Sequence, residues 1–285
     1  MTRPLPPIPE PVVRDIVLRA LAEDLGRGDL TTDATVPPDL PGAATLGARD
    51  SLVIAGLRVF AAVFEAIDPR ITVEPKVEDG ARLAPGDVAA AVRGPANPIL
   101  KGERVALNLV QRMSGVATRT ARFVDALPAG SKTRITDTRK TTPGLRALER
   151  YAVRCGGGHN HRDDLSSAVL IKDNHIAACG SIREAIARAR AFAPHTSKIE
   201  CEVDGLDQLR EALEAGADIV LLDNFDDDAI AEAVSIVGGR ALVEVSGRVT
   251  LERVPKIAAA GVDAISIGGL THSAPAVDLG LDWAA

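Results

Sequence analysis

The sequence predicts an α/β protein in which an N-terminal domain is followed by an incomplete or irregular α/β barrel. After Ser131, six strand-like segments alternate with helical segments, a rhythm typical of parallel strands joined by right-handed crossovers. Six strands are fewer than a complete eight-stranded barrel contains. The charge pattern of one strand, residues 198–204, favours the barrel over a doubly wound sheet, which is the second possibility.

An N-terminal helix is expected over residues 11–25, where apolar side chains recur at helical spacing until Gly26 and Gly28 end the pattern. Residues 42–95 have the pattern of short strands, separated by glycine- and proline-containing turns, around one helix within 52–67.

A long helical run follows over residues 101–127, and the strand–helix rhythm begins after it. We therefore expect an N-terminal domain at residues 1–108 and a barrel domain at 109–274. The tail, residues 275–285, is expected to pack back on the N-terminal domain.

The strand segments of the barrel domain are short aliphatic runs bounded by turn signals. They are TRITDT (133–138), AVLIK (168–172), KIECEVD (198–204), DIVLLDN (218–224), ALVEVSG (241–247) and DAISIGG (263–269). Helices are expected between them at 181–193, 206–217, 227–239 and 250–261. The first of these helices opens with Ser181 and Glu184, at the spacing of a capping box.

The strand 198–204 decides between the two folds. Its charged residues alternate with apolar ones, so one face carries Lys198, Glu200, Glu202 and Asp204. A doubly wound sheet has helices on both faces and would bury these charges without partners. In a barrel the charged face points inward, where it meets opposite charges or a substrate. The alternative is an edge strand whose charged face is solvated.

Composition excludes several classes of protein. The net charge of −6 and the aromatic content of 2% argue against a nucleic-acid or membrane-surface binder. No apolar run approaches the length of a membrane span, and MTRPLPPIPEP lacks the apolar core of a signal peptide. Three cysteines without a CxxC pair favour reduced thiols. We therefore expect a cytoplasmic protein with no nucleic-acid or membrane partner.

Positive charge gathers in one segment of the chain. Between Lys132 and His175, nine Lys/Arg residues stand against five Asp/Glu residues, a net charge of +4, so the remainder carries −10. A cationic segment in an acidic protein indicates an anionic small molecule more than a long polyanion.

The predicted strands end in groups that suit such ligands. Ligands of α/β barrels bind at the carboxyl ends of the strands, and the last strand loops often hold a phosphate. The glycines of 246–247 and 268–269 let backbone N–H groups approach phosphate oxygens, although a glycine at a strand end is usually only a turn.

Cations at three loop or strand ends have the charge to hold two carboxylates, and they are Arg139, Arg162 and Lys172. Glu202 and Asp223, on neighbouring strands, suit sugar hydroxyls, directly or through Mg²⁺. The alternative for all five is the ordinary one, solvated cations and simple ion pairs.

A zinc site is a further hypothesis, raised by Cys155, His159, His161 and Asp163. Their spacing does not match the usual structural zinc patterns, and the sequence has no second ligand cluster. The segment GGGHNH is instead expected to form a flexible loop that closes over a ligand.

Five longer motifs are more specific. They are ERVALNLVQRMSGVAT (103–118), DTRKTTPGLRALERYAVRCGGGHNHRDDL (137–165), LIKDNHI (170–176), LLDNF (221–225) and GGLTHS (268–273). Together they closely resemble the quinolinate phosphoribosyltransferase family, and the likeness extends from about residue 24 to Leu281.

The resemblance implies a type II phosphoribosyltransferase, with an N-terminal α/β sandwich joined to an open, seven-element α/β barrel. It implies that quinolinate and phosphoribosyl pyrophosphate react with Mg²⁺ present, giving nicotinate mononucleotide, pyrophosphate and CO₂ on the de novo route to NAD. It also implies a homodimer, with hexamers in some members, in which the N-terminal domain of one subunit caps the barrel of the other.

The resemblance implies roles for single residues. It assigns the quinolinate pocket to Arg139, Arg162, Lys172 and His161, and it implies that Arg104 enters the partner's site. The residues matched to the phosphoribosyl donor are Lys140, Glu202, Asp223, Ser246, Gly247, Arg248, Ile267, Gly268 and Gly269, and Thr138 is expected as a further substrate-binding residue.

Among these, the resemblance makes Lys140, Glu202 and Asp223 the catalytic residues. One position departs from the family pattern, because Arg248 stands where a second glycine is expected. An arginine there either adds a phosphate contact or shifts the loop.

Three other functions stay open. A molybdenum-transport-associated homologue would use another phosphoribosyl acceptor, and CO₂ release from quinolinate separates the two. A non-catalytic anion-binding protein on the same barrel would bind without turnover. A nucleic-acid binder would show salt-sensitive binding to a random duplex.

Overall fold

The computed structural model describes residues 5–283, which form two compact units. The first unit comprises the described residues up to Ala121 together with 141–157 and 269–283, and the second comprises 122–140 and 158–268. None of the helices in this described part is both long and apolar enough to cross a membrane.

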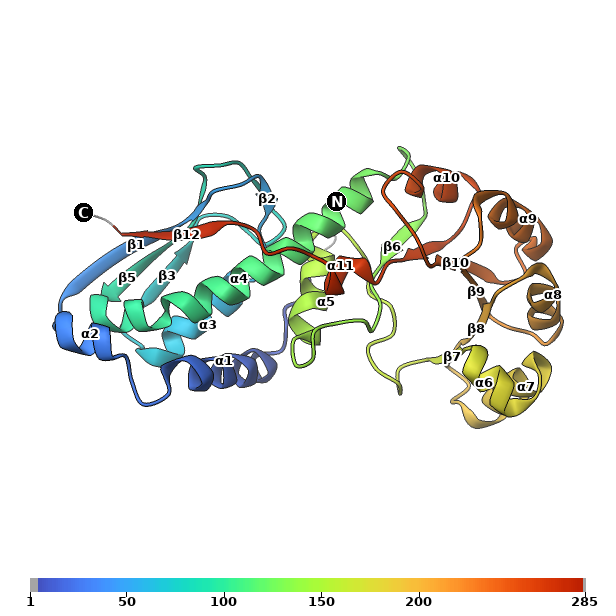
Figure 1. Ribbon diagram of the computed structural model, residues 1–285, viewed down its shortest axis with the longest axis horizontal. Helices are drawn as coiled ribbons and strands as arrows, with labels where there is room; N and C mark the ends of the chain where they lie inside the picture. The colour runs from blue at the N-terminus through green and yellow to red at the C-terminus, as the bar shows by residue number, and fades with distance from the viewer. Residues whose placement is uncertain (1–4, 284–285) are drawn as a thin grey trace. The chain divides into compact units, whose positions relative to one another are not determined.

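A four-stranded antiparallel sheet forms the centre of the first unit. Its order is β12 (Leu279–Trp283), β1 (Pro41–Ala48), β5 (Val88–Pro95) and β3 (Thr72–Pro75). Two short strands, β2 (Leu52–Val53) and β4 (Arg82–Leu83), pair separately. Leu46 of β1 lies opposite Leu281 of β12, so the last strand of the chain completes a sheet that the first strand begins (Figure 1).

The first unit also contains helices, some of which lie along this sheet (Figure 1). Its helices are α1 (Glu10–Leu25), α2 (Leu30–Thr35), α3 (Leu57–Ile67), α4 (Ala96–Asp125), α5 (Arg146–Cys155) and α11 (Gly269–His272). With few aromatic residues available, the core is mainly aliphatic, and its one described ring pair is Phe60 and Phe64, edge to face at 5.1 Å.

The domain boundary expected at residue 108 falls inside α4, because this helix continues through Asp125. Residues 141–157 also belong to the first unit, since α5 packs on α4 so closely that a Cβ at Gly156 would lie 2.4 Å from the Ala117 carbonyl oxygen. The first unit is therefore larger than the sequence pattern indicates.

Six parallel strands form the second unit. They are β6 (Arg134–Thr136), β7 (Val169–Ile171), β8 (Ile199–Val203), β9 (Ile219–Asp223), β10 (Leu242–Ser246) and β11 (Ala264–Ser266), in the order β6-β11-β10-β9-β8-β7. The helices of this unit are α6 (Asp173–Cys179), α7 (Ile182–Phe192), α8 (Leu206–Glu214), α9 (Asp227–Val237) and α10 (Val254–Ala259).

The curved sheet with its helices on the outer side is an open α/β barrel, and this confirms the predicted fold class (Figure 1). The doubly wound alternative is wrong because the helices cover one face of the sheet. The edge-strand alternative for residues 198–204 is wrong because β8 lies between β7 and β9.

A seventh element continues the barrel wall beyond β6. His159 forms a parallel bridge with Thr136, its N–H donates to the Ile135 carbonyl at 2.8 Å, and its carbonyl accepts from Asp137 N–H at 3.1 Å. The backbone of His159 is therefore paired with β6 as an additional strand-like element. Closure of the GGGHNH segment over a ligand stays a prediction.

Candidate functional site

The carboxyl ends of the parallel strands bring the predicted site residues of the second unit to one edge. Asp223 at the end of β9 is in register with Ser246 at the end of β10, and Thr136 of β6 is in register with Ser266 of β11. Thr138, Arg139 and Lys140 follow β6, Lys172 follows β7, and Ile267 and Gly268 follow β11. Ends of parallel strands meet at one edge because all the strands run in the same direction.

Two predicted site residues lie in the first unit. Arg104 is an exposed residue of α4, and Gly269 begins α11. Their predicted roles stay predictions.

Cations and acids at this edge are paired. Lys172 Nζ forms a salt bridge with Glu202 Oε2, which joins the end of β7 to β8. Arg162 donates from Nη1 to the Ala168 carbonyl at 3.0 Å. Burial and the nearby charge of Arg139 lower the pKa of Arg162, while Glu200 opposes that effect. The two arginines are therefore close enough to repel each other, as expected for a site that holds an anion.

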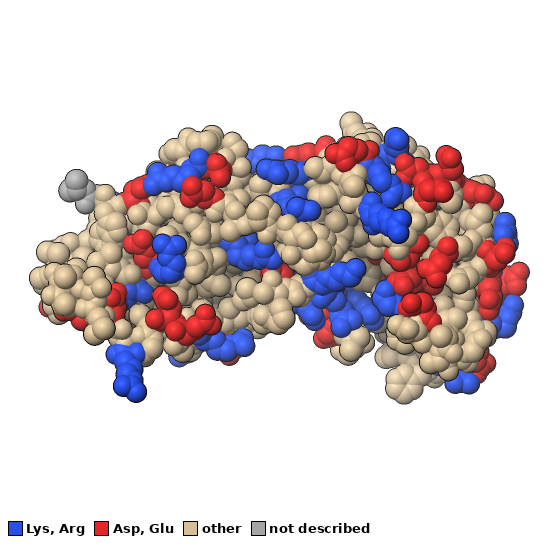
Figure 2. All heavy atoms as spheres, viewed as in Figure 1, with Lys and Arg blue, Asp and Glu red and all other residues tan. Residues whose placement is uncertain are grey.

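The space-filling view shows where charged side chains lie on one face of the molecule (Figure 2). Acidic side chains gather over α8 and α9, and basic and acidic residues are mixed over the rest of the visible face (Figure 2).

A buried cluster lies among the strands of the second unit. His161 Nε2 is 3.3 Å from Glu200 Oε2 and 3.3 Å from Glu244 Oε1, and the three groups offer ligand atoms within 4.8 Å of one another. Burial alone would lower the pKa of His161, but hydrogen bonds and charge from Glu200 and Glu244 raise it to about 10. Burial, together with the charge of Glu244, raises the pKa of Glu200.

The zinc site considered for Cys155, His159, His161 and Asp163, which their spacing disfavours, is not assembled among the described residues. Cys155 belongs to α5 of the first unit, where burial raises the pKa of its thiol. Among the described residues, the His/Cys/Asp/Glu group with metal-binding geometry contains His161 but neither His159, Cys155 nor Asp163. Sequence reasoning missed Glu200 and Glu244 as partners of His161, although both have the strand alternation that turns a side chain inward.

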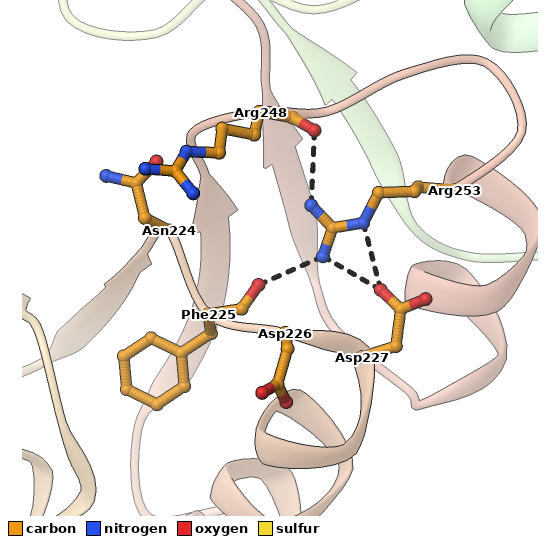
Figure 3. A pocket seen from close by; sticks show the side chains of 6 residues that line it. All are labelled: Asn224, Phe225, Asp226, Asp227, Arg248 and Arg253. Carbon is orange, nitrogen blue, oxygen red and sulfur yellow. Dashed lines mark hydrogen bonds and ion pairs between the residues drawn. The ribbon is translucent and has the colours of Figure 1, made fainter.

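The loops after β9 and β10 surround a small cavity of 240 Å³. Its lining residues are Asn224, Phe225, Asp226, Asp227, Arg248 and Arg253 (Figure 3). Arg253 ties the two loops together, because its guanidinium donates to the carbonyls of Phe225 at 2.9 Å and Arg248 at 3.1 Å and to Asp227 Oδ1 at 2.8 and 3.0 Å.

Backbone geometry explains why a glycine is expected at position 248. Arg248 has φ of +49° and Gly247 has φ of +83°, both in the left-handed region that favours glycine. A side chain at 247 has no room, since a Cβ there would lie 2.3 Å from Asn224 Oδ1. Arg248 is tolerated because its exposed side chain projects from the loop toward Asn224 (Figure 3).

An open α/β barrel whose strand ends carry paired cations, acids and glycine loops defines a class of enzymes that act on small anionic metabolites. Protein-family comparison is specific within that class. The model "Quinolinate phosphoribosyl transferase, N-terminal domain" matches residues 29–114, and the corresponding C-terminal domain model matches residues 116–282. The chain belongs to the quinolinate phosphoribosyltransferase family.

Individual relatives agree. A probable nicotinate-nucleotide pyrophosphorylase [carboxylating] of Bacillus subtilis (strain 168) is 44% identical over 260 residues, covering 91% of this chain and 89% of that protein. The Mycobacterium leprae (strain TN) nicotinate-nucleotide pyrophosphorylase [carboxylating] is 45% identical over 275 residues, with 94% and 96% covered. The crystal structure of NadC from Streptococcus pyogenes superposes with a TM-score of 0.91 at 41% identity, covering 96% of this chain and 97% of that one.

Proposed function

We propose that this protein transfers the phosphoribosyl group of phosphoribosyl pyrophosphate to quinolinate with decarboxylation, in NAD biosynthesis. The observation that carries the proposal is the match of both family domains over residues 29–282, on a barrel whose strand ends carry the required charges. The products are nicotinate mononucleotide, pyrophosphate and CO₂. The molybdenum-transport-associated alternative is not favoured, because the relatives described above are carboxylating pyrophosphorylases.

Quinolinate is held by its two carboxylates in this proposal. Arg139, Arg162 and Lys172 supply the cations, and His161 lines the pocket. Two observations support the assignment. Besides burial, the charge of Arg139 lowers the pKa of Arg162, so the two cations lie near each other. Lys172 forms an ion pair with the carboxylate of Glu202, so its ammonium group is in a position to bind a carboxylate. Arginine suits the planar carboxylate because it binds two oxygens at once.

The phosphoribosyl donor occupies the remaining strand ends. Ser246, Gly247, Arg248 and 267–269 take its 5′-phosphate, Lys140 lies near the pyrophosphate, and Thr138 is a further substrate-binding residue. The left-handed turn at Gly247 supports a phosphate loop, because it exposes backbone N–H groups. Glu202 and Asp223 take the ribose hydroxyls.

The residues present also fit Mg²⁺. Glu202 and Asp223 offer carboxylate oxygens on the adjacent strands β8 and β9, and Mg²⁺ prefers oxygen ligands shared between one or two carboxylates and a substrate phosphate. When bound, the ion neutralises charge on the leaving pyrophosphate.

The chemistry follows from the placement of charge. The lone pair of the pyridine nitrogen attacks C1 of ribose as the bond from C1 to pyrophosphate breaks, and Lys140 stabilises the departing anion. Glu202 and Asp223 stabilise the positive charge that develops on the sugar. The bond from C2 to its carboxylate then breaks, its electron pair moves toward the cationic ring, CO₂ leaves, and C2 takes up a proton. No general base is needed to activate the attacking nitrogen, because it carries no proton.

The assembly belongs to the same proposal. We expect a homodimer, with a hexamer as a further possibility, in which Arg104 enters the site of the partner subunit. The exposure of Arg104 on α4 supports this expectation. The cytoplasm is the proposed location.

A single reaction tests the proposal. Purified protein is mixed with quinolinate labelled in its 2-carboxylate, phosphoribosyl pyrophosphate and Mg²⁺, and labelled CO₂ and nicotinate mononucleotide are measured. We expect both products in equal amounts, no turnover with nicotinate in place of quinolinate, and loss of turnover with a chelator that excess Mg²⁺ reverses. Binding of quinolinate without either product would contradict the proposal.

A further inference from the structure

The His161 side chain is held from both sides. Its Nε2 lies between Glu200 on β8 and Glu244 on β10, at 3.3 Å from an oxygen of each. Its Nδ1 accepts the backbone N–H of Arg162 at 2.7 Å, which requires a neutral ring with its proton on Nε2 and so opposes the rise in pKa that the two glutamates cause. Both ring nitrogens therefore have partners in the protein, and the plane of the imidazole is fixed.

The backbone that carries His161 is fixed as well. The buried carboxylate of Asp137 accepts the His161 N–H at 2.7 Å through Oδ1 and the Asn160 side-chain amide at 2.6 Å through Oδ2. Asp137 lies two residues before Arg139, a predicted quinolinate ligand. The same strand end thus anchors the segment that carries His161 and Arg162.

Glu200 and Glu244 are unusual because each is a buried carboxylate on a barrel strand, with 3% and 6% of the residue exposed. Oε1 of Glu200 has no hydrogen-bond partner in the structure, and the Glu244 oxygen that faces His161 Nε2 is Oε1, at 3.3 Å, so His161 is placed to compensate both carboxylates. A buried acid that is incompletely paired lowers stability and is retained where it does something else.

We propose that Glu200 and Glu244 are positioning residues that orient His161, and through it Arg162, for recognition of quinolinate. The inference rests on the proposed function. The two carboxylates hold the Nε2–H inside the barrel, and the ring in turn holds the Arg162 amide through Nδ1. The guanidinium of Arg162 is anchored to the Ala168 carbonyl, so both ends of that residue have fixed positions. Quinolinate then meets a preformed cationic pocket, which lowers the cost of ordering on binding.

Steady-state kinetics separate this role from a general structural one. We expect E200Q and E244Q each to raise the KM for quinolinate about tenfold or more, the size expected for losing a hydrogen bond to a charged group. The KM for phosphoribosyl pyrophosphate should stay within about twofold, since neither Glu200 nor Glu244 is among its proposed ligands and glutamine keeps the length of each side chain. E232Q, a change at an exposed residue of α9, is the matched control and should alter neither value.

A double-mutant cycle tests whether the glutamates act through His161. In an H161N background, E244Q should add little to the KM for quinolinate, because the group that it positions is already gone. Independent, additive effects of H161N and E244Q would overturn the proposal. Equal changes in both KM values would also overturn it.

A spectroscopic readout does not depend on turnover. Histidine-selective ¹⁵N labelling resolves five residues at most, and H161N identifies the His161 signals. We expect an Nε2–H proton that is protected from solvent exchange in the wild type and that shifts or exchanges rapidly in E200Q and E244Q. An unchanged signal, or a tightly bound metal ion in the purified protein with all three side chains as ligands, would sink the inference. If the wild type shows this proton but makes no mononucleotide, the proposed function fails and the hydrogen-bonded cluster stands.

Discussion

Arg112 of α4 and Glu149 of α5 form an ion pair in the first unit, with Nε and Nη2 of the arginine 3.0 and 2.7 Å from Oε1 of the glutamate. The Glu149 side chain is fully buried. Its oxygens also accept the Thr142 N–H at 3.0 Å and the Thr142 hydroxyl at 2.7 Å. Arg112 donates further to the carbonyls of Thr271 and Ala274. The pair therefore connects α4, α5 and the loop before α5 with α11 and the residues that follow it.

Removing one member of this pair should be costly. We expect E149A to lower the free energy of unfolding by about 3–5 kcal/mol, because it leaves Arg112 largely buried without its counter-charge. Urea denaturation followed by circular dichroism measures the change. E214A, which breaks an exposed ion pair with Arg183, should cost less than about 1 kcal/mol. Similar losses of unfolding free energy in the two variants would show that the buried pair stabilises the protein no more than the exposed pair does.

Asp79 gives the first unit a dependence on pH. Its Oδ1 accepts the N–H groups of Gly56 and Leu57 at the start of α3, and its Oδ2 accepts the Tyr151 hydroxyl at 2.8 Å. Burial raises the pKa of Asp79 above its ordinary value of 3.8, although these hydrogen bonds oppose the shift. The folded protein therefore binds this proton more tightly than the unfolded chain does. The stability that Asp79 contributes is present below pH 3.8 and is lost as the pH rises from 3.8 through the raised pKa of the folded state.

The variant D79N tests this sign. The difference in unfolding free energy between wild type and D79N should shrink as pH rises from 3.8 through the raised pKa, because only the wild type loses stability there. Y151F should cost about 1 kcal/mol and steepen the dependence, since it removes a bond that favours the charged carboxylate. A difference that grows with pH would contradict the assignment.

Substitutions of Arg248 distinguish the effect of backbone strain on stability from an effect of the side chain on ligand binding. R248G relieves a left-handed backbone cost of about 1 kcal/mol, and the added freedom of the unfolded chain offsets most of that gain. The melting temperature should therefore hardly change. If the guanidinium binds phosphate, the KM for phosphoribosyl pyrophosphate should rise about three- to tenfold in R248G and less in R248K. R210A, which removes a surface arginine from α8, serves as the control, and equal KM values in all variants would exclude a phosphate contact.

Lys140 is expected to act on the leaving group. K140A should lower kcat about 10²- to 10³-fold while quinolinate affinity changes little, because the charge on pyrophosphate develops in the transition state. The check combines initial rates with equilibrium binding of quinolinate. K198A removes an exposed lysine from the opposite, amino-terminal end of β8 and should leave kcat unchanged. Unaltered turnover in K140A would refute the role.

Most of the barrel is predictable from sequence because its strands are local aliphatic runs of the correct length. Two elements of the first unit are not. The arginines of α5 obscure its apolar pattern in the sequence, although Leu148, Ala152 and Val153 are buried in the structure. Strand β1 consists mainly of small residues with weak strand preference, and it is stabilised by pairing with β12 from the other end of the sequence.

Some contacts of the candidate site can likewise be predicted from the sequence, and others cannot. Lys172 and Glu202 could be placed together in advance, because consecutive parallel strands bring their ends to one edge. The contact of His161 with Glu200 and Glu244 depends on the curvature of the sheet, which no local pattern encodes. The left-handed turn at Arg248 breaks the residue preference for that geometry, so only the backbone reveals it.

The pairing of β1 with β12 has a consequence for synthesis on the ribosome. All six strands of the barrel have been translated by residue 268, whereas one edge of β1 waits for residues 279–283. Until then β1 exposes an open edge of unpaired backbone groups, the kind of surface that invites association between nascent chains.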